Sequence, residues 1–296
     1  MIEPIVYPDT EFYLSHIARP WISGLLISSL GPVLYVCLQW LLHVAATTAL
    51  WFRFRLPVAC ALYLACPAIL DYQQAVLSDG LFVSVFVLTL CAPKDYTGIL
   101  AGLLPLIRPY GLLVGPLLAF CRRDWFILAT WAPLPLIVCA LNLGWHGAFS
   151  ITPQLGVVLS QQAGIGSGSW EWGSGSTSLA LVEIASNPTV YLHNVSHNML
   201  GMTLPGDRGP LANWALLIAL GMLPILGKWR LEWAILYVYF LGQAVISSGY
   251  ERKQLPLMPI RCLLLATLLD DGALWRRLKT WATEMRKRKL AKLEKE

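Results

Sequence analysis

The sequence predicts an all-α polytopic membrane protein, and three observations support this fold class. Hydrophobic residues make up 56% of the 296-residue chain, its mean hydropathy is +0.59, and charged residues make up only 13%. Apolar runs long enough for spanning helices recur along the chain and are separated by short polar or basic segments. We therefore expect residues 1–296 to form a single membrane domain.

The expected elements follow from the apolar runs, since a spanning helix needs about 20 apolar residues. The first clear span covers residues 31–52, and residues 20–30 either extend it or lie at the membrane interface. It ends at Arg53 and Arg55. Further spanning helices are expected at residues 56–70, 80–92, 124–144, 210–227, 231–249 and 256–270. The total is about seven spanning helices.

The distribution of basic residues predicts the orientation, because cytoplasmic loops carry an excess of Lys and Arg. If Arg53 and Arg55 are cytoplasmic, the N-terminus lies outside. Residues 1–30 then form an outer-face acidic segment with a juxtamembrane helix, and residues 145–208 form an outer-face loop. The basic residues 272–296 form a cytoplasmic tail, which we expect to contact anionic lipid and not nucleic acid.

A helix break is expected at Arg108 and Pro109, in the middle of the apolar segment 99–121. One straight crossing would put Arg122 and Arg123 outside, against the charge rule. Two half-helices that turn at Arg108 keep that pair inside. The sequence therefore predicts a re-entrant helix pair whose turn lies near the outer face.

The outer-face loop contains a Gly- and Ser-rich stretch, residues 164–178, around Trp170, Glu171 and Trp172. Its composition favours a linker or interfacial anchor, and two Trp beside a carboxylate also fit a lid over a sugar-bearing ligand. Residues 179–193 are expected to form an interfacial helix. The chain has no phosphate-binding, hydrolase or dinucleotide motif, which argues against soluble cofactor chemistry.

Two acidic residues of the N-terminal segment, Asp9 and Glu11, are the first candidate site residues. An Asp-x-Glu pair can bind a divalent cation, or one carboxylate can act as a general base. The alternative is that both are simply solvated.

Asp79, which opens an apolar run, and Arg108 are the next candidates. A functional Arg in this setting would bind a phosphate. The structural alternatives are that Ser78 or Asp79 caps a helix N-terminus, and that Arg108 forms an ion pair with Asp79 or Asp71.

A late basic segment, residues 250–259, contains Tyr250, Arg252 and Lys253 beside two prolines. Basic residues on the outer side run against the usual bias, so this pair is a candidate anion site, to which Arg261 could add. Interfacial snorkelling of the two side chains is the alternative.

In this order the segments resemble the C superfamily of membrane glycosyltransferases, in particular the protein mannosyltransferase and lipid A aminoarabinose-transferase group. The resemblance covers about residues 7–121 and 231–270. It rests on an acidic outer segment, an acidic helix start, an Arg-Pro re-entrant element and a basic-Pro segment: YPDTEFYLSHIARPWISGLLISSLG, LSDGLFVSVFVLTL, LLPLIRPYGLLVGPLLAF and YERKQLPLMP.

The resemblance implies an inverting transfer of a sugar from a polyprenyl-phosphate donor to a glycolipid, polysaccharide or protein hydroxyl. Asp9 would be the general base, with Glu11 assisting it or holding an optional Mg²⁺ or Mn²⁺. Arg108, Arg252 and Lys253 would bind the leaving phosphate, Asp79 would orient the acceptor or a cation, and Tyr110 and Tyr250 would contribute to substrate binding.

Family members also have a spanning helix before the acidic segment, whereas this sequence starts with that segment. We expect one of three explanations: the true start codon lies elsewhere, the protein is a reduced member of the family, or a partner subunit supplies the helix. A transporter or flippase of an anionic lipid and a non-catalytic subunit of a glycosylation complex are the rival functions. The expected location is the bacterial inner membrane.

Overall fold

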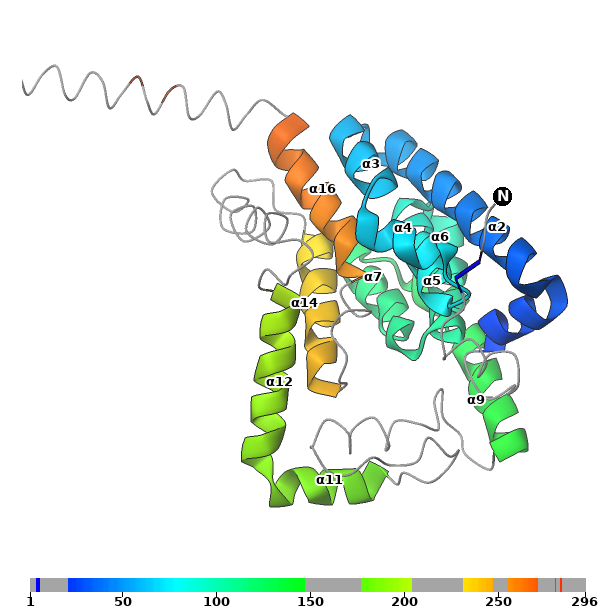
Figure 1. Cartoon of the computed structure of the whole chain (residues 1–296), viewed down its shortest axis with the longest axis vertical. Helices are drawn as coiled ribbons and strands as arrows, with labels where there is room; N and C mark the ends of the chain where they lie inside the picture. The colour runs from blue at the N-terminus through cyan, green and yellow to red at the C-terminus, as the bar shows by residue number, and fades with distance from the viewer. Residues whose placement is uncertain are drawn as a thin grey trace, which may run out of the picture.

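The computed structural model describes residues 4–5, 21–146, 177–203, 231–246 and 255–270, together with residues 280 and 283. Regular structure in these ranges is helical, apart from a parallel bridge between Ile5 and Ala75 (Figure 1). The prediction of an all-α protein is therefore confirmed for the described residues.

The helices follow the predicted apolar runs in most places. The described elements are α2 (Trp21–Phe54), α3 (Pro57–Leu64), α4 (Pro67–Gln74), α5 (Ser78–Cys91), α6 (Lys94–Ile107), the 3₁₀ turn η1 (Pro109–Gly111), α7 (Val114–Arg122), α8 (Trp125–Trp131), α9 (Pro133–His146), α11 (Thr177–Ser186), α12 (Pro188–Thr203), α14 (Leu231–Ile246) and α16 (Leu257–Asp270). The run predicted at residues 210–227 lies outside the described residues.

Helix α2 is interrupted where the sequence predicted the first span to begin. Gly31 has φ 73° and ψ 165°, a conformation that side chains oppose, and Pro32 follows it. The segment before Gly31 is thus a separate short helix that leads into the long one.

The expected span at residues 56–70 is not one continuous helix. Instead, α3 and α4 are eight residues each, and each has a proline at its first position, Pro57 and Pro67. Proline favours a helix start and turns the preceding residue away from helical geometry, which separates the two helices at Cys66.

The predicted break at Arg108 is present. Helix α6 ends at Ile107, Arg108 is extended with φ −146° and ψ 129°, and Pro109 starts η1. At the far end of this helical hairpin, Arg122 of α7 donates a hydrogen bond to Thr97 Oγ1 of α6 at 2.9 Å. The chain therefore reverses direction between α6 and α7, as the sequence predicted.

Close packing at the turn of the hairpin depends on glycine. A Cβ built on Gly111 would come within 2.7 Å of the carbonyl carbon of Leu104, so only a residue without a side chain fits there. The turn can therefore fold back directly onto the last part of α6.

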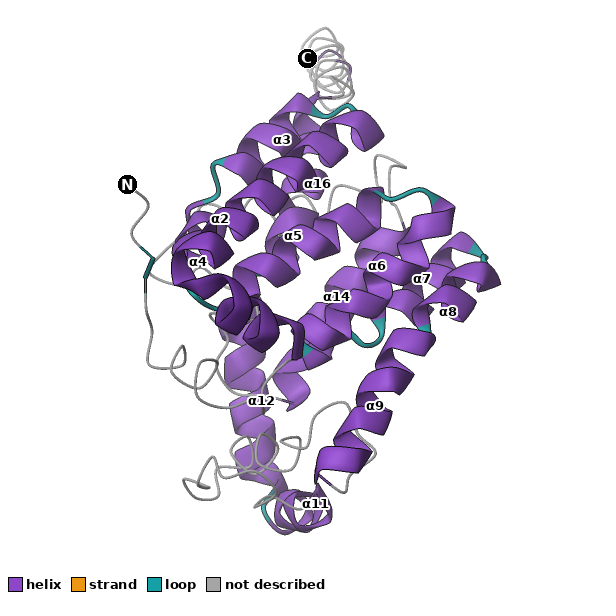
Figure 2. Cartoon of the chain, turned by 90° about the vertical axis from the view of Figure 1, so that its right-hand side faces the viewer, coloured by secondary structure: helices purple, strands orange, loops and turns teal. Residues whose placement is uncertain are grey.

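Helix α5 lies at the centre of the helical body, packed by α2, α4 and α6 (Figure 2). Every α5 residue except Leu88 is buried. The helix is apolar all round, which is the pattern of a helix enclosed by other helices. Around this core, α16 packs on α3, and α14 packs on α7 and α12.

The described part of residues 145–208, the segment predicted as an outer-face loop, contains two helices. The interfacial helix predicted at residues 179–193 is divided at Asn187, before Pro188, into α11 and α12. Helices α9 and α12 project from the helical body to the same side, and α11 lies at the far end of α12 (Figures 1 and 2).

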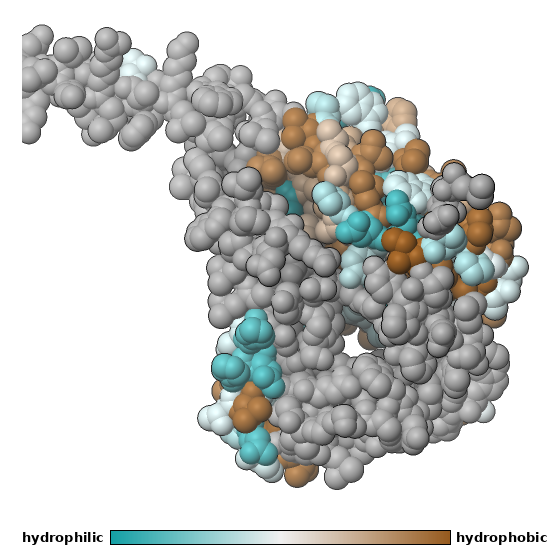
Figure 3. Space-filling model, viewed as in Figure 1, coloured by the Kyte–Doolittle hydropathy of each residue, from teal (hydrophilic) through white to brown (hydrophobic). Residues whose placement is uncertain are grey.

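Two of the described helical segments are long and apolar enough to cross a membrane, Ile22–Phe54 and Trp125–Gly144. Only 22% of the most apolar part of each is buried inside the protein, so neither resembles the enclosed core helix of a soluble protein. Apolar side chains also gather over α2 and α3 in Figure 3. These features indicate membrane association.

Candidate functional site

The candidate site is built around Asp79, in the first turn of α5. Leu77 has extended geometry and occupies the N-cap position, so the expectation that Ser78 or Asp79 caps this helix is wrong. The Asp79 side chain is only 1% exposed. It lies at the N-terminal end of α5, where the helix dipole is positive.

Arg108 forms an ion pair with Asp79 through Nη2 and Oδ2. The Arg108 side chain is 17% exposed and comes from the turn of the α6–α7 hairpin. The structure therefore confirms the alternative in which Arg108 pairs with Asp79. Asp71, the other acid considered, is exposed on α4.

The second carboxylate oxygen of Asp79, Oδ1, is buried and accepts no hydrogen bond from the described part of the chain. A carboxylate can accept several hydrogen bonds, and a buried oxygen without one is costly. Asp79 thus retains an acceptor that a cation or a hydroxyl donor could use.

Two side chains of α2 hold the loop that leads into α5. The Tyr35 hydroxyl donates to the Leu77 carbonyl at 2.9 Å, and Gln39 Nε2 donates to the Ala75 carbonyl at 2.8 Å. Gln39 Oε1 in turn accepts from the Leu81 backbone N–H at 3.0 Å. Because both side chains are fully buried, they fix the backbone on either side of Asp79.

Helix α4 supports the same turn. Gln73 Nε2 donates to the Gly80 carbonyl at 3.2 Å and to Ser84 Oγ at 3.1 Å. Gly80 lies so close to its neighbours that a Cβ would approach the Tyr72 carbonyl oxygen to 2.6 Å. The Asp79 turn is therefore tightly enclosed.

The N-terminal segment joins this loop through a short parallel bridge. Ile5 N–H donates to the Gln74 carbonyl, and Val76 N–H donates to the Ile5 carbonyl, both at 3.0 Å. Ile5 therefore lies beside the loop that leads into α5, and its partner Val76 precedes Asp79 by three residues. Asp9 follows Ile5 by four residues in the sequence.

Tyr110, also predicted as a substrate-binding residue, packs in an aromatic cluster. Its ring lies 4.7 Å from the ring of Phe82 and 6.4 Å from that of Phe240. Its backbone carbonyl accepts a 2.6 Å hydrogen bond from the Tyr239 hydroxyl. In this structure Tyr110 therefore joins the hairpin turn to α5 and α14.

The other predicted site residues lie outside the described residues: Asp9, Glu11, Tyr250, Arg252 and Lys253. The chain is described again from Leu255, which is buried. Arg261 is 6% exposed, and its Nη1 lies 3.7 Å from Met258 Sδ, so it is enclosed by the helices instead of snorkelling to the surface.

The described residues contain no group of three or more His, Cys, Asp and Glu side chains placed to hold an ion. The carboxylates predicted as optional Mg²⁺ or Mn²⁺ ligands, Asp9 and Glu11, are outside these ranges. Their metal binding stays a prediction.

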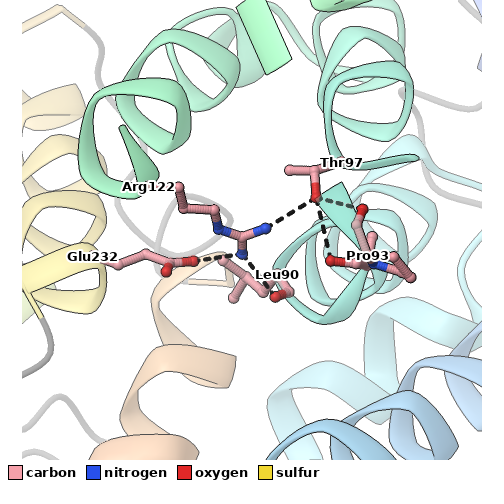
Figure 4. A network of polar contacts seen from close by, with 6 residues as sticks. Leu90, Pro93, Thr97, Arg122 and Glu232 are labelled. Carbon is pink, nitrogen blue, oxygen red and sulfur yellow. Dashed lines mark hydrogen bonds and ion pairs between the residues drawn. The ribbon is translucent and has the colours of Figure 1, made fainter. Parts of the chain in front are cut away.

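A second ionic centre lies at the opposite end of α5 and was not predicted (Figure 4). Arg122 Nη2 donates to the Leu90 carbonyl at 2.9 Å and pairs with Glu232 Oε1 at 2.7 Å. Its Nη1 bonds Thr97, whose hydroxyl also donates to the Pro93 carbonyl at 2.9 Å. This centre ties the end of α5 to α6, α7 and α14.

Some of these residues had a signal in the sequence. Tyr35, Gln39 and His43 are spaced by four in an otherwise apolar helix, which places them on one face, and all three are fully buried. Polar residues in an apolar helix usually face the bundle interior. The sequence gives no signal for the Arg122–Glu232 pair, because 110 positions separate the two residues.

Comparisons with protein-family models, with curated proteins and with solved structures find no significant match for this chain.

Proposed function

We propose that the protein is a membrane glycosyltransferase that moves a sugar from a polyprenyl-phosphate donor to an acceptor hydroxyl. The observation that carries the proposal is the Asp79–Arg108 pair, which is enclosed at the turn of a helical hairpin. Buried charges in an apolar helical protein are costly, and they commonly mark substrate or ion sites. The sequence resemblance to the C superfamily supports the same reading.

Arg108 would hold the leaving phosphate of the donor. A guanidinium has five N–H donors, so one Arg can bind a carboxylate and a phosphate together. Arg252 and Lys253 would add positive charge. Helices α6 and α7, at 14 and 9 residues, are too short to cross a 30 Å core singly, which fits a re-entrant pair.

In the proposed reaction the acceptor oxygen attacks the anomeric carbon and forms the new C–O bond. The bond from that carbon to the phosphate oxygen breaks, and its electron pair leaves with the phosphate. Asp9 would take the proton of the acceptor hydroxyl, and Glu11 would assist it or hold an optional Mg²⁺ or Mn²⁺. Asp79 Oδ1 would accept a hydrogen bond from the acceptor or contact a cation.

Acceptors of the proposed reaction are a glycolipid, a polysaccharide or a protein. The proposal places the reaction at the outer face of the bacterial inner membrane, in a helical domain with about seven spans and the C-superfamily fold. The bridge from Ile5 to the Asp79 loop supports a shared site, because it joins the segment that carries Asp9 to the turn that carries Asp79. A partner subunit could complete the domain.

The test is transfer by the purified protein in liposomes. Radiolabelled polyprenyl-phosphate sugars and a membrane lipid extract are added to wild type, Asp9→Asn, Asp79→Asn and Asp71→Asn. We expect a labelled product with wild type and with Asp71→Asn, since Asp71 is an exposed acid outside the site. Asp9→Asn should lose at least about 100-fold in rate, the usual range for a missing base. Asp79→Asn should also slow transfer, because it weakens the contact that orients the acceptor or a cation.

Two results would overturn the proposal. Movement of the labelled lipid across the liposome membrane without a new product would indicate a transporter or flippase. Donor binding without turnover, unchanged by Asp9→Asn, would indicate a non-catalytic subunit. Circular dichroism of each variant separates loss of the reaction from loss of the fold.

A further inference from the structure

An apolar groove lies at the end of α5 opposite to Asp79. It has a volume of about 380 Å³ and is lined by α2, α5 and α6, mainly by Ala49, Leu88, Cys91, Ala92, Tyr96 and Ile99. Tyr96 is 61% exposed and Ile99 is also exposed, so the groove opens onto the outer surface of the helices.

Basic side chains surround one end of this groove. Arg53 lies one helical turn after Ala49 on α2 and is exposed. Lys94 directly follows the groove residue Pro93, and its side chain is 73% exposed. Both cations are therefore available to an anion at the groove end.

The acidic residues near this end do not cancel the positive charge. Lys94 lies 3.6 Å from Asp124, which also accepts a hydrogen bond from the Phe126 N–H at the start of α8. Asp95 is the other nearby acid in the sequence, and Arg55 adds a further cation. Arg122 and Glu232, which pair with each other beside Leu90, add one charge of each sign, so four basic residues against three acidic ones still leave an excess of positive charge.

Aromatic residues at this end fit a membrane interface. The guanidinium of Arg55 lies 5.9 Å from the ring centre of Trp51 and 5.5 Å from that of Phe52. Both rings are exposed, like Tyr96. Aromatic rings beside basic side chains are typical of the boundary between acyl chains and headgroups.

From these observations we propose that the groove binds an anionic phospholipid. One acyl chain lies in the groove between α2, α5 and α6, and Arg53 and Lys94 bind the phosphate. The groove residues are apolar apart from the Tyr96 hydroxyl, so the site fits a hydrocarbon chain and not a sugar. It is distinct from the Asp79–Arg108 site, and it does not depend on the proposed glycosyl transfer.

The experiment is native mass spectrometry of the full-length protein released from detergent micelles. The micelles contain equal amounts of dioleoyl phosphatidylglycerol and dioleoyl phosphatidylcholine, which share the same chains and differ in headgroup charge. We expect wild type to retain phosphatidylglycerol preferentially. The double variant Arg53→Gln/Lys94→Gln should lower that preference by about fivefold per removed charge.

Three controls make the result specific. Lys287→Gln/Lys289→Gln removes the same charge from the basic C-terminal tail, which is itself expected to contact anionic lipid, and should lower the preference by less than the groove variant does. Ala49→Phe, which fills the groove from a half-buried position, should reduce retention of both lipids. Added glycerol phosphate, a headgroup without chains, should not compete.

The proposal is overturned if the groove variants retain both lipids like wild type. It is also overturned if the C-terminal variant alone loses the preference, because the tail would then be the lipid contact, or if glycerol phosphate displaces the lipid. Thermal unfolding of each variant shows whether it is folded, and Ala49→Ser serves as a second, smaller change if Ala49→Phe does not fold. Ala49→Ser is then expected to lower retention of both lipids slightly, by placing a hydroxyl in the apolar wall.

Discussion

The two ends of α5 each carry an Arg–carboxylate pair, but the pairs have different surroundings. At the Asp79 end the carboxylate is 1% exposed, and one of its oxygens has no partner among the described residues. At the Leu90 end, Glu232 is 24% exposed, and Arg122 also bonds a hydroxyl and a backbone carbonyl. The helical rise puts the two ends about 17 Å apart.

This difference separates a candidate site from a structural clamp. The Arg122 centre joins four helices with satisfied hydrogen bonds, so it lowers the free energy of the folded state without leaving a group for a ligand. The Asp79 centre is held in place by Tyr35, Gln39 and Gln73, and its unused acceptor is still available for chemistry. Variants of each centre should therefore differ in what they change.

The largest effect is expected for Arg108→Gln. It leaves the Asp79 carboxylate buried without its cation, which should lower the free energy of unfolding by about 3–5 kcal/mol. Asp79→Asn leaves a partly exposed Arg108 and should cost about 1–3 kcal/mol. Denaturant unfolding in detergent micelles measures both values.

The double variant Asp79→Asn/Arg108→Gln is the control for that prediction. It has no buried charge left unpaired, so it should be more stable than Arg108→Gln alone. Equal losses for the two single variants would mean that Asp79 is not enclosed as the structure describes.

A smaller effect is expected at the clamp. Arg122→Gln loses the ion pair with Glu232 and weakens the bonds to Thr97 and Leu90, which should cost about 2–3 kcal/mol. Glu232→Gln should cost about 1 kcal/mol, because Arg122 keeps its other acceptors. The measurement is the same unfolding experiment, together with the transfer rate per folded molecule.

We expect that transfer rate to stay at the wild-type value in Glu232→Gln. If the transfer rate of Glu232→Gln falls as far as that of Asp79→Asn, the division between site and clamp is wrong. Both ends of α5 would then act on the reaction.

Effects no larger than those at the clamp are expected for a matched glycine pair. A Cβ on Gly80 would approach the Tyr72 carbonyl oxygen to 2.6 Å, and a Cβ on Gly98 would overlap Thr130 Oγ1 and the Ile127 carbonyl oxygen. Gly80→Ala and Gly98→Ala should each cost about 1–3 kcal/mol, measured by denaturant unfolding in micelles. Only Gly80→Ala should also slow transfer, because it displaces the Asp79 turn.

Gly144→Ala is the reference for this pair, since its Cβ would meet no atom within 4 Å. It should be neutral or slightly stabilising, because Ala favours a helix over Gly. If Gly144→Ala costs as much as the other two, crowding is not the cause of their effect.

Several features of the fold could be predicted from the sequence because their causes are local. Gly31 and Pro32 mark the kink in α2, and Pro109 marks the end of α6. The helices α14 and α16 follow from apolar runs alone. Proline also explains a departure, because Pro67 divides the run at residues 56–70 into two helices.

The candidate site could be predicted only in part. Asp79 and Arg108 were identified because a charge in an apolar run needs a partner, and the pairing of these two residues was one stated alternative. The residues that hold the Asp79 turn, Tyr35 and Gln39, had a spacing signal but no indication of their targets. Hydrogen-bond partners 42 and 36 positions away cannot be read from spacing within one helix.

The sequence by itself determined the helical class, the apolar character and the position of the hairpin turn, since composition, proline and glycine act through the local backbone. The tertiary structure decided which charges meet. It enclosed Asp79 with Arg108, joined Arg122 to Glu232 across the bundle, and left the apolar groove open beside Arg53. The physical reason is that an ion pair depends on distances between helices, and packing of the whole chain sets those distances.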